Sequence, residues 1–294
     1  MSKAKVYFTK EITSESLIKI YNALGRELKR KTCVKLSSGE PGGHYFLNPN
    51  LIKNLVTKLN GTIVEGLTAY GGKRMHIKDA WQAMEDHGFK AIAPCDILDE
   101  EGAVKLPIEG GKHLHGYDVV GSHIKNYNST LVLSHFKGHV AGGFGGALKN
   151  MSIGFASSNG KALIHSAGVN DDPAKFFENV AQQDDFLESM AEACYAIIHY
   201  FKPENMAYIN VANNLSIDCD CDANPAPPEL ADIGIFASLD PVAIDQACYD
   251  AVVNSPDPGK KALCERMEKQ HAIHIVEEAV RLGLGTREYE IVNI

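Results

Sequence analysis

The residues best suited to chemistry lie in one glycine-rich stretch, residues 134–149, which reads SHFKGHVAGGFGGALK. Five glycines in sixteen residues predict a backbone that approaches a ligand closely or adopts positive φ repeatedly. Neutral imidazole binds transition metals or moves protons near pH 7. We therefore expect His135, His139 and Lys149 to form the floor of an active site. The glycines expected to hold a cofactor there are Gly142, Gly143, Gly145 and Gly146.

The lysine at the end of this stretch, Lys149, has two candidate roles. It can bind an anion, or it can attach a group covalently if burial lowers the pKa of its amine. The stretch does not match the phosphate-binding Walker loop, because Lys149 neither follows a glycine nor precedes Ser or Thr. It does not match the dinucleotide fingerprint either.

A second candidate site is the segment Asp218-Cys-Asp-Cys-Asp222. Cys219 and Cys221 can bind one soft metal or form half of a larger cluster site, whereas the plainer alternative is two inert surface thiols. The flanking aspartates predict exposure of this segment. The sequence contains no C-x-x-C-x-x-C run and so lacks a ferredoxin signature. Because no secretory segment is recognisable, we expect a cytoplasmic protein without disulfides.

Two further positions have competing interpretations. Lys73 and Arg74 follow two glycines, so this loop can offer backbone N–H groups and two cations to an anion. The alternative is a helix-entry turn with solvated charges. His165 by itself is expected to be a structural histidine at the end of a strand.

Apolar, partly β-branched runs alternate with helical patterns along the chain. This rhythm predicts an α/β fold: a mainly parallel sheet with helices on both faces. Ligands of such sheets bind beyond the carboxyl ends of the strands, where the glycine-rich loops are expected. We expect a single domain over residues 1–294, with residues 159–172 as a candidate boundary between two lobes. The runs expected to be strands are 5–8, 33–36, 62–65, 117–120, 131–133, 206–211, 233–236 and 289–292.

The net charge of −8 argues against a nucleic-acid partner, which would favour a basic surface. No window approaches the roughly 20 apolar residues that span a bilayer, so no membrane partner is expected. The expected partners are a small anionic molecule and an electron-transfer protein. The oligomeric state is left open.

Taken together, these motifs resemble the domain of unknown function 362 family, whose members are often described as uncharacterised iron–sulfur-centre proteins. The resemblance rests on residues 133–139, 142–150, 218–221 and 232–243, and it covers nearly the whole chain. It implies a metal or metallo-cofactor: an iron–sulfur cluster, zinc or nickel. Many relatives carry a ferredoxin-like insertion, which this chain lacks.

A more local resemblance is to the nickel-pincer lactate racemases. It rests on the order His139, Phe144, Lys149, His165. It implies that His139 is an acid/base, Lys149 the covalent anchor and His165 a nickel ligand. Gly145 stands where that family has serine, and Ala147 where it has glycine.

Three hypotheses follow. The first is a metal-dependent, redox-linked enzyme acting on a small anion. The second is a nickel-pincer isomerase of 2-hydroxy acids. The third is a module that binds a small anion without chemistry. All three require the side chains of His139, Lys149 and His165 to meet at one pocket.

Overall fold

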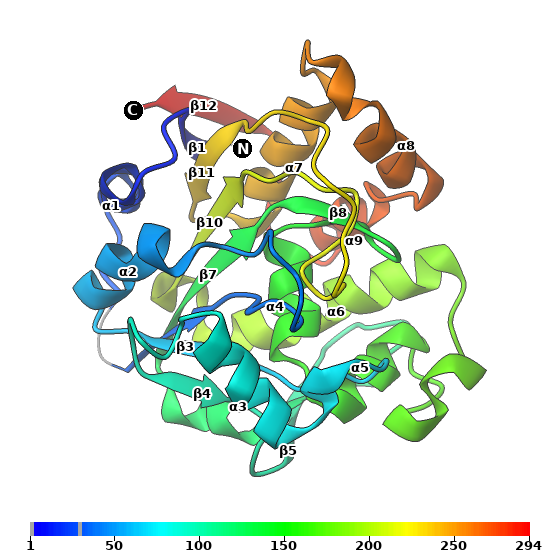
Figure 1. Cartoon of the computed structure of the whole chain (residues 1–294). Coiled ribbons are helices and arrows are strands. Elements are labelled where there is room, and N and C mark those ends of the chain that lie inside the picture. The colour runs from blue at the N-terminus through cyan, green and yellow to red at the C-terminus, as the bar shows by residue number, and fades with distance from the viewer. Residues whose placement is uncertain (1–2, 29–30) are drawn as a thin grey trace.

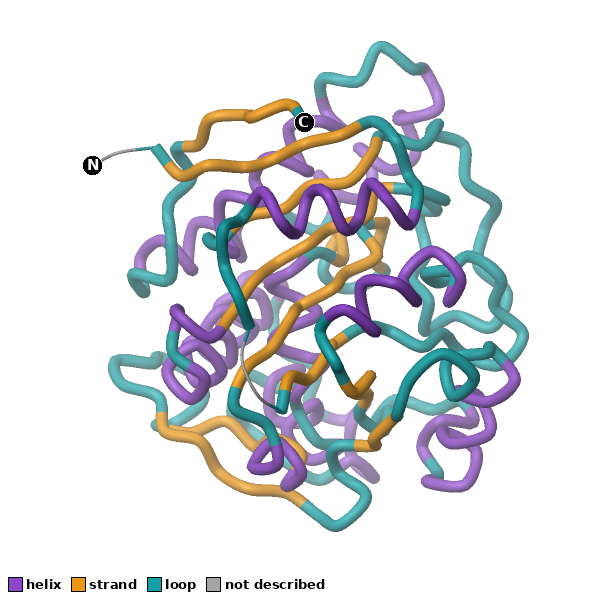
Figure 2. The backbone as a smooth tube through the Cα atoms, turned by 90° about the vertical axis from the view of Figure 1, so that its left-hand side faces the viewer, coloured by secondary structure: helices purple, strands orange, loops and turns teal. Residues whose placement is uncertain are grey.

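An eight-stranded sheet forms the centre of the computed structural model, which describes residues 3–28 and 31–294 (Figures 1 and 2). The strand order is β12-β1-β11-β10-β7-β2-β3-β4. All neighbours pair in parallel except β11, which is antiparallel to β1 and β10. The predicted mainly parallel sheet is therefore confirmed. Its strands are β1 (Ala4–Thr9), β2 (Thr32–Lys35), β3 (Thr62–Glu65), β4 (Cys95–Ile97), β7 (Ser129–His135), β10 (Met206–Ala212), β11 (Gly234–Ser238) and β12 (Tyr289–Asn293).

Helices cover both faces of this sheet. Side chains of a strand alternate between faces, and on β7 Leu131 and Leu133 belong to one buried cluster while Val132 belongs to the other. The first cluster packs against α1 (Ser14–Ala23), α2 (Pro49–Lys58) and α3 (Ile77–Asp86). The second packs against the remaining helices, which are α4 (Ala147–Phe155), α5 (Ser158–His165), α6 (Gln183–Phe201), α7 (Pro241–Val253), α8 (Lys261–Lys269) and α9 (His274–Arg281).

Local sequence signals explain where several helices begin. Asn48 accepts a hydrogen bond from the backbone N of Asn50 at 2.9 Å, and Pro49 occupies the first turn of α2. Asp240 likewise caps α7 by accepting from the backbone N of Val242 and of Ala243, both at 2.9 Å. An Asn or Asp cap followed by proline predicts a helix start from sequence, and both helices begin where this signal places them.

Three expectations about elements are wrong. His165 lies at the end of helix α5, not of a strand, because Ser157 caps a helix by accepting from the backbone N of Gly160. The strand at 117–120 exists as β6 (Tyr117–Gly121), but it pairs with β5 (Ala103–Pro107) outside the main sheet. The sequence pattern of residues 269–282 predicts one last helix, but this helix begins only at His274, after α8 has ended.

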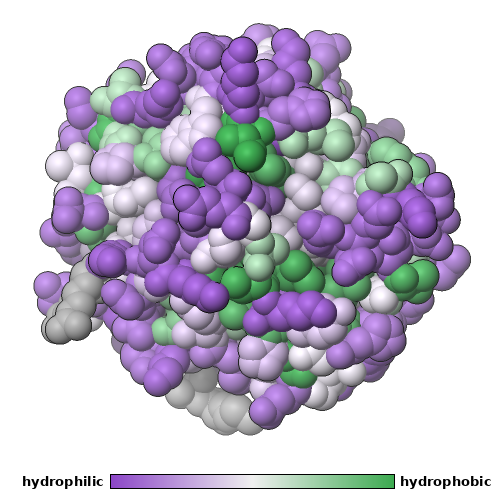
Figure 3. Space-filling view, turned by 90° about the horizontal axis from the view of Figure 1, so that it is seen from below, coloured by the Kyte–Doolittle hydropathy of each residue, from purple (hydrophilic) through white to green (hydrophobic). Residues whose placement is uncertain are grey.

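The surface seen in Figure 3 is mostly hydrophilic, with smaller hydrophobic patches between the polar side chains. Among the described residues, no helix combines the length and the apolar character that crossing a membrane requires.

Candidate functional site

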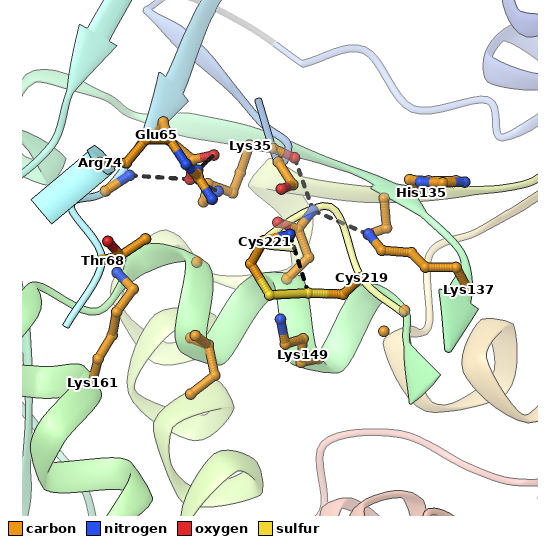
Figure 4. A pocket seen from close by; sticks show the side chains of 18 of the residues that line it. Lys35, Glu65, Thr68, Arg74, His135, Lys137, Lys149, Lys161, Cys219 and Cys221 are labelled. Atoms are coloured by element: carbon orange, nitrogen blue, oxygen red, sulfur yellow. Dashed lines mark hydrogen bonds and ion pairs between the residues drawn. A yellow bond between two sulfur atoms is a disulfide. The ribbon is translucent and has the colours of Figure 1, made fainter. Parts of the chain in front are cut away.

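A polar cavity lies beyond the carboxyl ends of β2, β3 and β7, where α4 and α5 meet the sheet (Figure 4). Including its open mouth it encloses about 550 Å³. Its lining is unusually rich in cations for a largely buried space. These are Lys35 at the end of β2, Arg74 after β3, Lys137 after β7, Lys149 on α4 and Lys161 on α5.

Carboxylates neutralise two of these cations on one side of the cavity. Glu65 accepts from Lys35 Nζ at 2.9 Å and from Arg74 Nη1 at 3.2 Å. Glu40 accepts from Arg74 Nε at 2.8 Å. Burial alone would raise the pKa of Glu65, but the charges of Lys35 and Arg74 outweigh it and lower this pKa to about 2. The predicted anion ligand Arg74 is thus held by carboxylates of the chain itself.

Asp220 neutralises a third cation. Lys137 Nζ donates to Asp220 Oδ2 at 2.7 Å, and His135 Nδ1 lies 2.8 Å from Oδ1. The other ring nitrogen of His135 lies 2.6 Å from the backbone oxygen of Asn213. Both ring nitrogens therefore face oxygen atoms of the chain, and His135 helps to position Asp220. The expectation that aspartates keep this segment exposed is wrong, since these pairs hold Asp220 and Cys219 buried.

Lys149 and Lys161 differ from the other three cations. Among the residues that the structure describes, no carboxylate lies within ion-pair distance of either amine. Lys161 Nζ donates to the backbone oxygen of Ala156 at 2.5 Å. Burial lowers the pKa of Lys149 to about 7, with a further contribution from the charge of Lys137. Burial also lowers the pKa of Lys161 to about 8. An anion that entered the cavity would find these two amines uncompensated.

The Cys219–Cys221 pair forms part of the cavity wall, as Figure 4 shows. The two sulfurs are joined in a disulfide, so the expectation of unpaired thiols is wrong for this pair. On its other side the pair borders an apolar groove that also contains His139, His165 and Phe176. The disulfide is thus a partition between the cationic cavity and the groove.

The two histidines in the groove are held in defined tautomers. Nδ1 of His139 accepts from the backbone N of Gly142 at 2.9 Å and of Ala141 at 3.2 Å, which leaves its proton on Nε2. Nδ1 of His165 donates to the backbone oxygen of Lys161 at 2.8 Å, which leaves its Nε2 lone pair available. Burial lowers the pKa of His165 to about 4, so its ring is neutral at pH 7.

The structure divides the three groups expected at one pocket between two spaces: His139 and His165 line the groove, whereas Lys149 lines the cavity on the other side of the disulfide. Burial, and then the charges of Lys149 and His165, lower the pKa of His139 well below its usual value. One ligand atom from each of His139, Cys219 and Cys221 lies within 4.8 Å of the others. This nitrogen and sulfur set fits zinc or iron once the disulfide is reduced, because the thiolate is the ligand.

The other predicted residues fall into two groups. Gly145 and Gly146 line the cavity, whereas Gly142 and Gly143 form the turn that holds His139. Gly143 has a φ of +76°, and a Cβ there would come within 2.4 Å of a neighbouring side chain. Lys73 is exposed on the rim of the groove, and its backbone N donates to Glu40 at 2.6 Å.

The N-terminus of α4 is not available to a ligand. Asp245 on α7 accepts from the backbone N of Ala147 at 2.7 Å and of Leu148 at 2.9 Å. These bonds use the N–H groups that a bound anion would otherwise take. Anion binding in this cavity therefore depends on side-chain amines.

Sequence reasoning missed Lys35, Lys161 and Glu65. A signal was present for Lys35, which interrupts the apolar run Cys-Val-Lys-Leu at 33–36, whereas Lys161 only precedes the run Ala-Leu-Ile at 162–164. A charge inside such a run is costly to bury unless it is paired or functional.

The model of a domain of unknown function, DUF362, matches residues 32–250, and the chain belongs to this family. No curated protein matches the sequence. Among solved structures, the lactate racemase apoprotein from Thermoanaerobacterium thermosaccharolyticum matches with a TM-score of 0.49 and 13% identity, over 85% of this chain and 57% of that one. A Thermotoga maritima protein matches with a TM-score of 0.45 and 13% identity, over 90% of this chain and 59% of that one. The chain thus spans less than two thirds of either protein, and at these TM-scores neither bears on its activity.

Proposed function

We propose that this member of the DUF362 family binds a small anionic substrate in the polar cavity and carries out metal-assisted, redox-linked chemistry at the Cys219–Cys221 wall. The observation that carries the proposal is the pair of uncompensated amines, Lys149 and Lys161, beside a cysteine pair and a buried histidine. A carboxylate or phosphate group beside either amine would accept charge-assisted hydrogen bonds from it.

In this proposal each residue has a separate task. Lys149 and Lys161 bind the anionic group, and Asp220 holds the Lys137 amine in place at 2.7 Å. The reduced thiols and His139 would hold zinc or iron; either metal would supply a Lewis acid when bound, and only iron would also supply an electron acceptor. Ligation through Nε2 would require the ring proton of His139 to move to Nδ1, which would then give up the two backbone hydrogen bonds that it accepts.

Anion binding is tested by calorimetry with small carboxylates and phosphate esters at pH 6.5. We expect Lys149→Met and Lys161→Met each to weaken binding by roughly tenfold or more, which corresponds to one charge-assisted hydrogen bond. Lys53→Met on the exposed face of α2 is the matched control and should bind as the wild type does. Equal affinity in all four proteins would refute the proposed anion site.

Metal binding is tested separately by elemental analysis of the protein before and after reduction with a dithiol. We expect reduced wild-type protein to hold about one equivalent of zinc or iron more than reduced Cys219→Ser does. An equal metal content in the two proteins would refute the role of the cysteine pair. If the metal contents are equal while anions still bind, the cavity is an anion-binding site and the redox part of the proposal fails.

A second candidate function is a nickel-pincer isomerase of 2-hydroxy acids. The specific observation in its favour is that Lys149 has an amine pKa of about 7 and so can act as a nucleophile. His165 also keeps a free Nε2 that suits a metal ligand. This candidate requires nickel and a covalent adduct on Lys149, which intact-mass measurement of the native protein detects. The unmodified mass in protein produced with nickel would count against it.

A further inference from the structure

A second cluster of metal-ligating side chains lies outside the cavity, where the start of α6 meets the turn between α8 and α9. One ligand atom from each of Asp184, His271 and His274 lies within 4.8 Å of the others. His271 Nδ1 lies 2.6 Å from Asp184 Oδ1, and His274 Nε2 lies 3.1 Å from Glu188 Oε1. The two imidazole rings stack with centroids 5.1 Å apart.

The backbone conformation of His271 is an independent indication that its side chain is functional. Helix α8 ends with the backbone N of His271 donating to Glu268 and that of Ala272 donating to Met267, both at 2.9 Å. The residue between helix and turn in this motif is usually glycine, because it takes positive φ. His271 has a φ of +47° there. A non-glycine residue in this conformation destabilises the folded state by about 1 kcal/mol. The half-exposed ion pair between His271 and Asp184 offsets little of this destabilisation.

We propose that Asp184, His271 and His274 form a binding site for a divalent transition-metal ion, with zinc as the best fit and the adjacent Glu188 as a fourth ligand. Zinc takes imidazole nitrogen and carboxylate oxygen ligands at about 2.0–2.2 Å, which sets its ligands about 3.3 Å apart in a tetrahedron. The observed separations of 2.6 and 3.1 Å need only small side-chain rotations to reach this spacing. Asp184 and His271 are free to make them, since their side chains are 50% and 53% exposed.

This site would also steady the loop that carries His139. Gln183, next to Asp184, donates to the backbone oxygens of Ala141 and Gln270, both at 2.8 Å. Gln270, next to His271, donates to the backbone oxygen of Val140 at 2.5 Å. Both segments that supply metal ligands therefore hold residues 140–141, whose backbone fixes the ring of His139. A metal ion joining them would restrict the motion of that loop.

The test uses protein carrying Cys219→Ser and Cys221→Ser, so that those thiols cannot compete for the ion. After treatment with a chelator, zinc is titrated against a chromophoric competitor, and the melting temperature is measured with and without zinc. We expect one equivalent of zinc to bind and to raise the melting temperature. His274→Gln should weaken binding by roughly tenfold or more. His199→Gln, an exposed histidine near the end of the same helix α6, is the matched control and should leave binding unchanged.

His271→Gly separates a metal ligand from a purely structural residue. Glycine favours the positive φ at this position, so we expect the metal-free variant to be at least as stable as its parent. Zinc should no longer raise its melting temperature. Binding of zinc to His271→Gly or His274→Gln as tightly as to the parent would overturn the proposal, as would the absence of binding to the parent.

Discussion

Replacing Lys149 by methionine should stabilise the protein, and more at low pH than at high pH. Methionine is close to lysine in length and carries no charge, so the packing around the side chain is largely preserved. In the wild-type protein the ammonium group lies in a cavity without a carboxylate partner in the described part of the chain. Burial there lowers its pKa from 10.5 to about 7.

The magnitude follows from this pKa shift. The pKa falls by about 3.5, and each pKa unit corresponds to 1.36 kcal/mol. Burying the charged amine therefore destabilises the folded state by at most roughly 5 kcal/mol. Lys149 is only partly buried, so solvent reduces this to about 2 kcal/mol. The cost is fully present below pH 7, where the folded state is charged. It declines between pH 7 and 10.5, because there the unfolded chain binds the proton that the folded protein has released.

Urea denaturation at pH 6 and at pH 9 measures this difference. We expect Lys149→Met to be more stable than the wild type by about 2 kcal/mol at pH 6 and by about 1 kcal/mol at pH 9. Lys53→Met, at an exposed position, is the control and should show no pH-dependent difference. If Lys149→Met were less stable than the wild type by the same amount at both pH values, the amine would have a partner in the folded state and the reasoning would be refuted.

Three further predictions concern groups in or near the cavity. Gly146→Ala should destabilise the protein by about 2 kcal/mol in urea denaturation, because a Cβ would lie 2.4 Å from Asp245 Oδ1; unchanged stability would contradict this packing. Burial raises the pKa of Asp118 to about 7, so the wild type should lose stability as the pH rises from 4 to 7, and Asp118→Asn should lack this loss in denaturation at pH 4.5 and 8. Anion binding at pH 8 should take up protons, because Lys149 and Lys161 have pKa values of about 7 and 8 and the anion favours their charged forms. Calorimetry in buffers of different ionisation enthalpy measures this uptake, and a heat that is the same in every buffer would contradict it.

The sheet could be predicted from sequence because its signals are local. The run Leu-Val-Leu at 131–133 within β7 is apolar, and helix starts such as Asn48-Pro49 depend only on neighbouring residues. Pairing is not local: residues 117–121 form a strand as expected, but nothing in that run specifies β5 as its partner. The short apolar run before His165 fits a strand or a helix equally well, and the cap at Ser157 decides for the helix.

The candidate site could be predicted in part for the same reason. The glycine-rich loop directly follows a predicted strand, and the ends of parallel strands lie at one edge of a sheet. The sequence therefore predicts that His139 and Lys149 lie at that edge, as they do. The spacing of residues could not show that both nitrogens of His135 are engaged by Asp220 and Asn213, which are about 80 residues away in sequence. Composition and cell compartment do not reveal the disulfide, because its formation depends on how closely the folded chain brings the Cys219 and Cys221 side chains together.

The distribution of charge in the cavity explains why its chemistry depends on two lysines. Glu40 and Glu65 neutralise Lys35 and Arg74 on one side, and Asp220 neutralises Lys137 on the other. A buried charge without a partner of opposite charge destabilises the folded state. Packing alone therefore does not account for Lys149 and Lys161, which have no carboxylate partner among the described residues. The lowered pKa values of the two amines reflect this destabilisation. A bound anion would stabilise the charged amines and so raise both pKa values. The same two amines therefore weaken the folded protein and provide the driving force for binding.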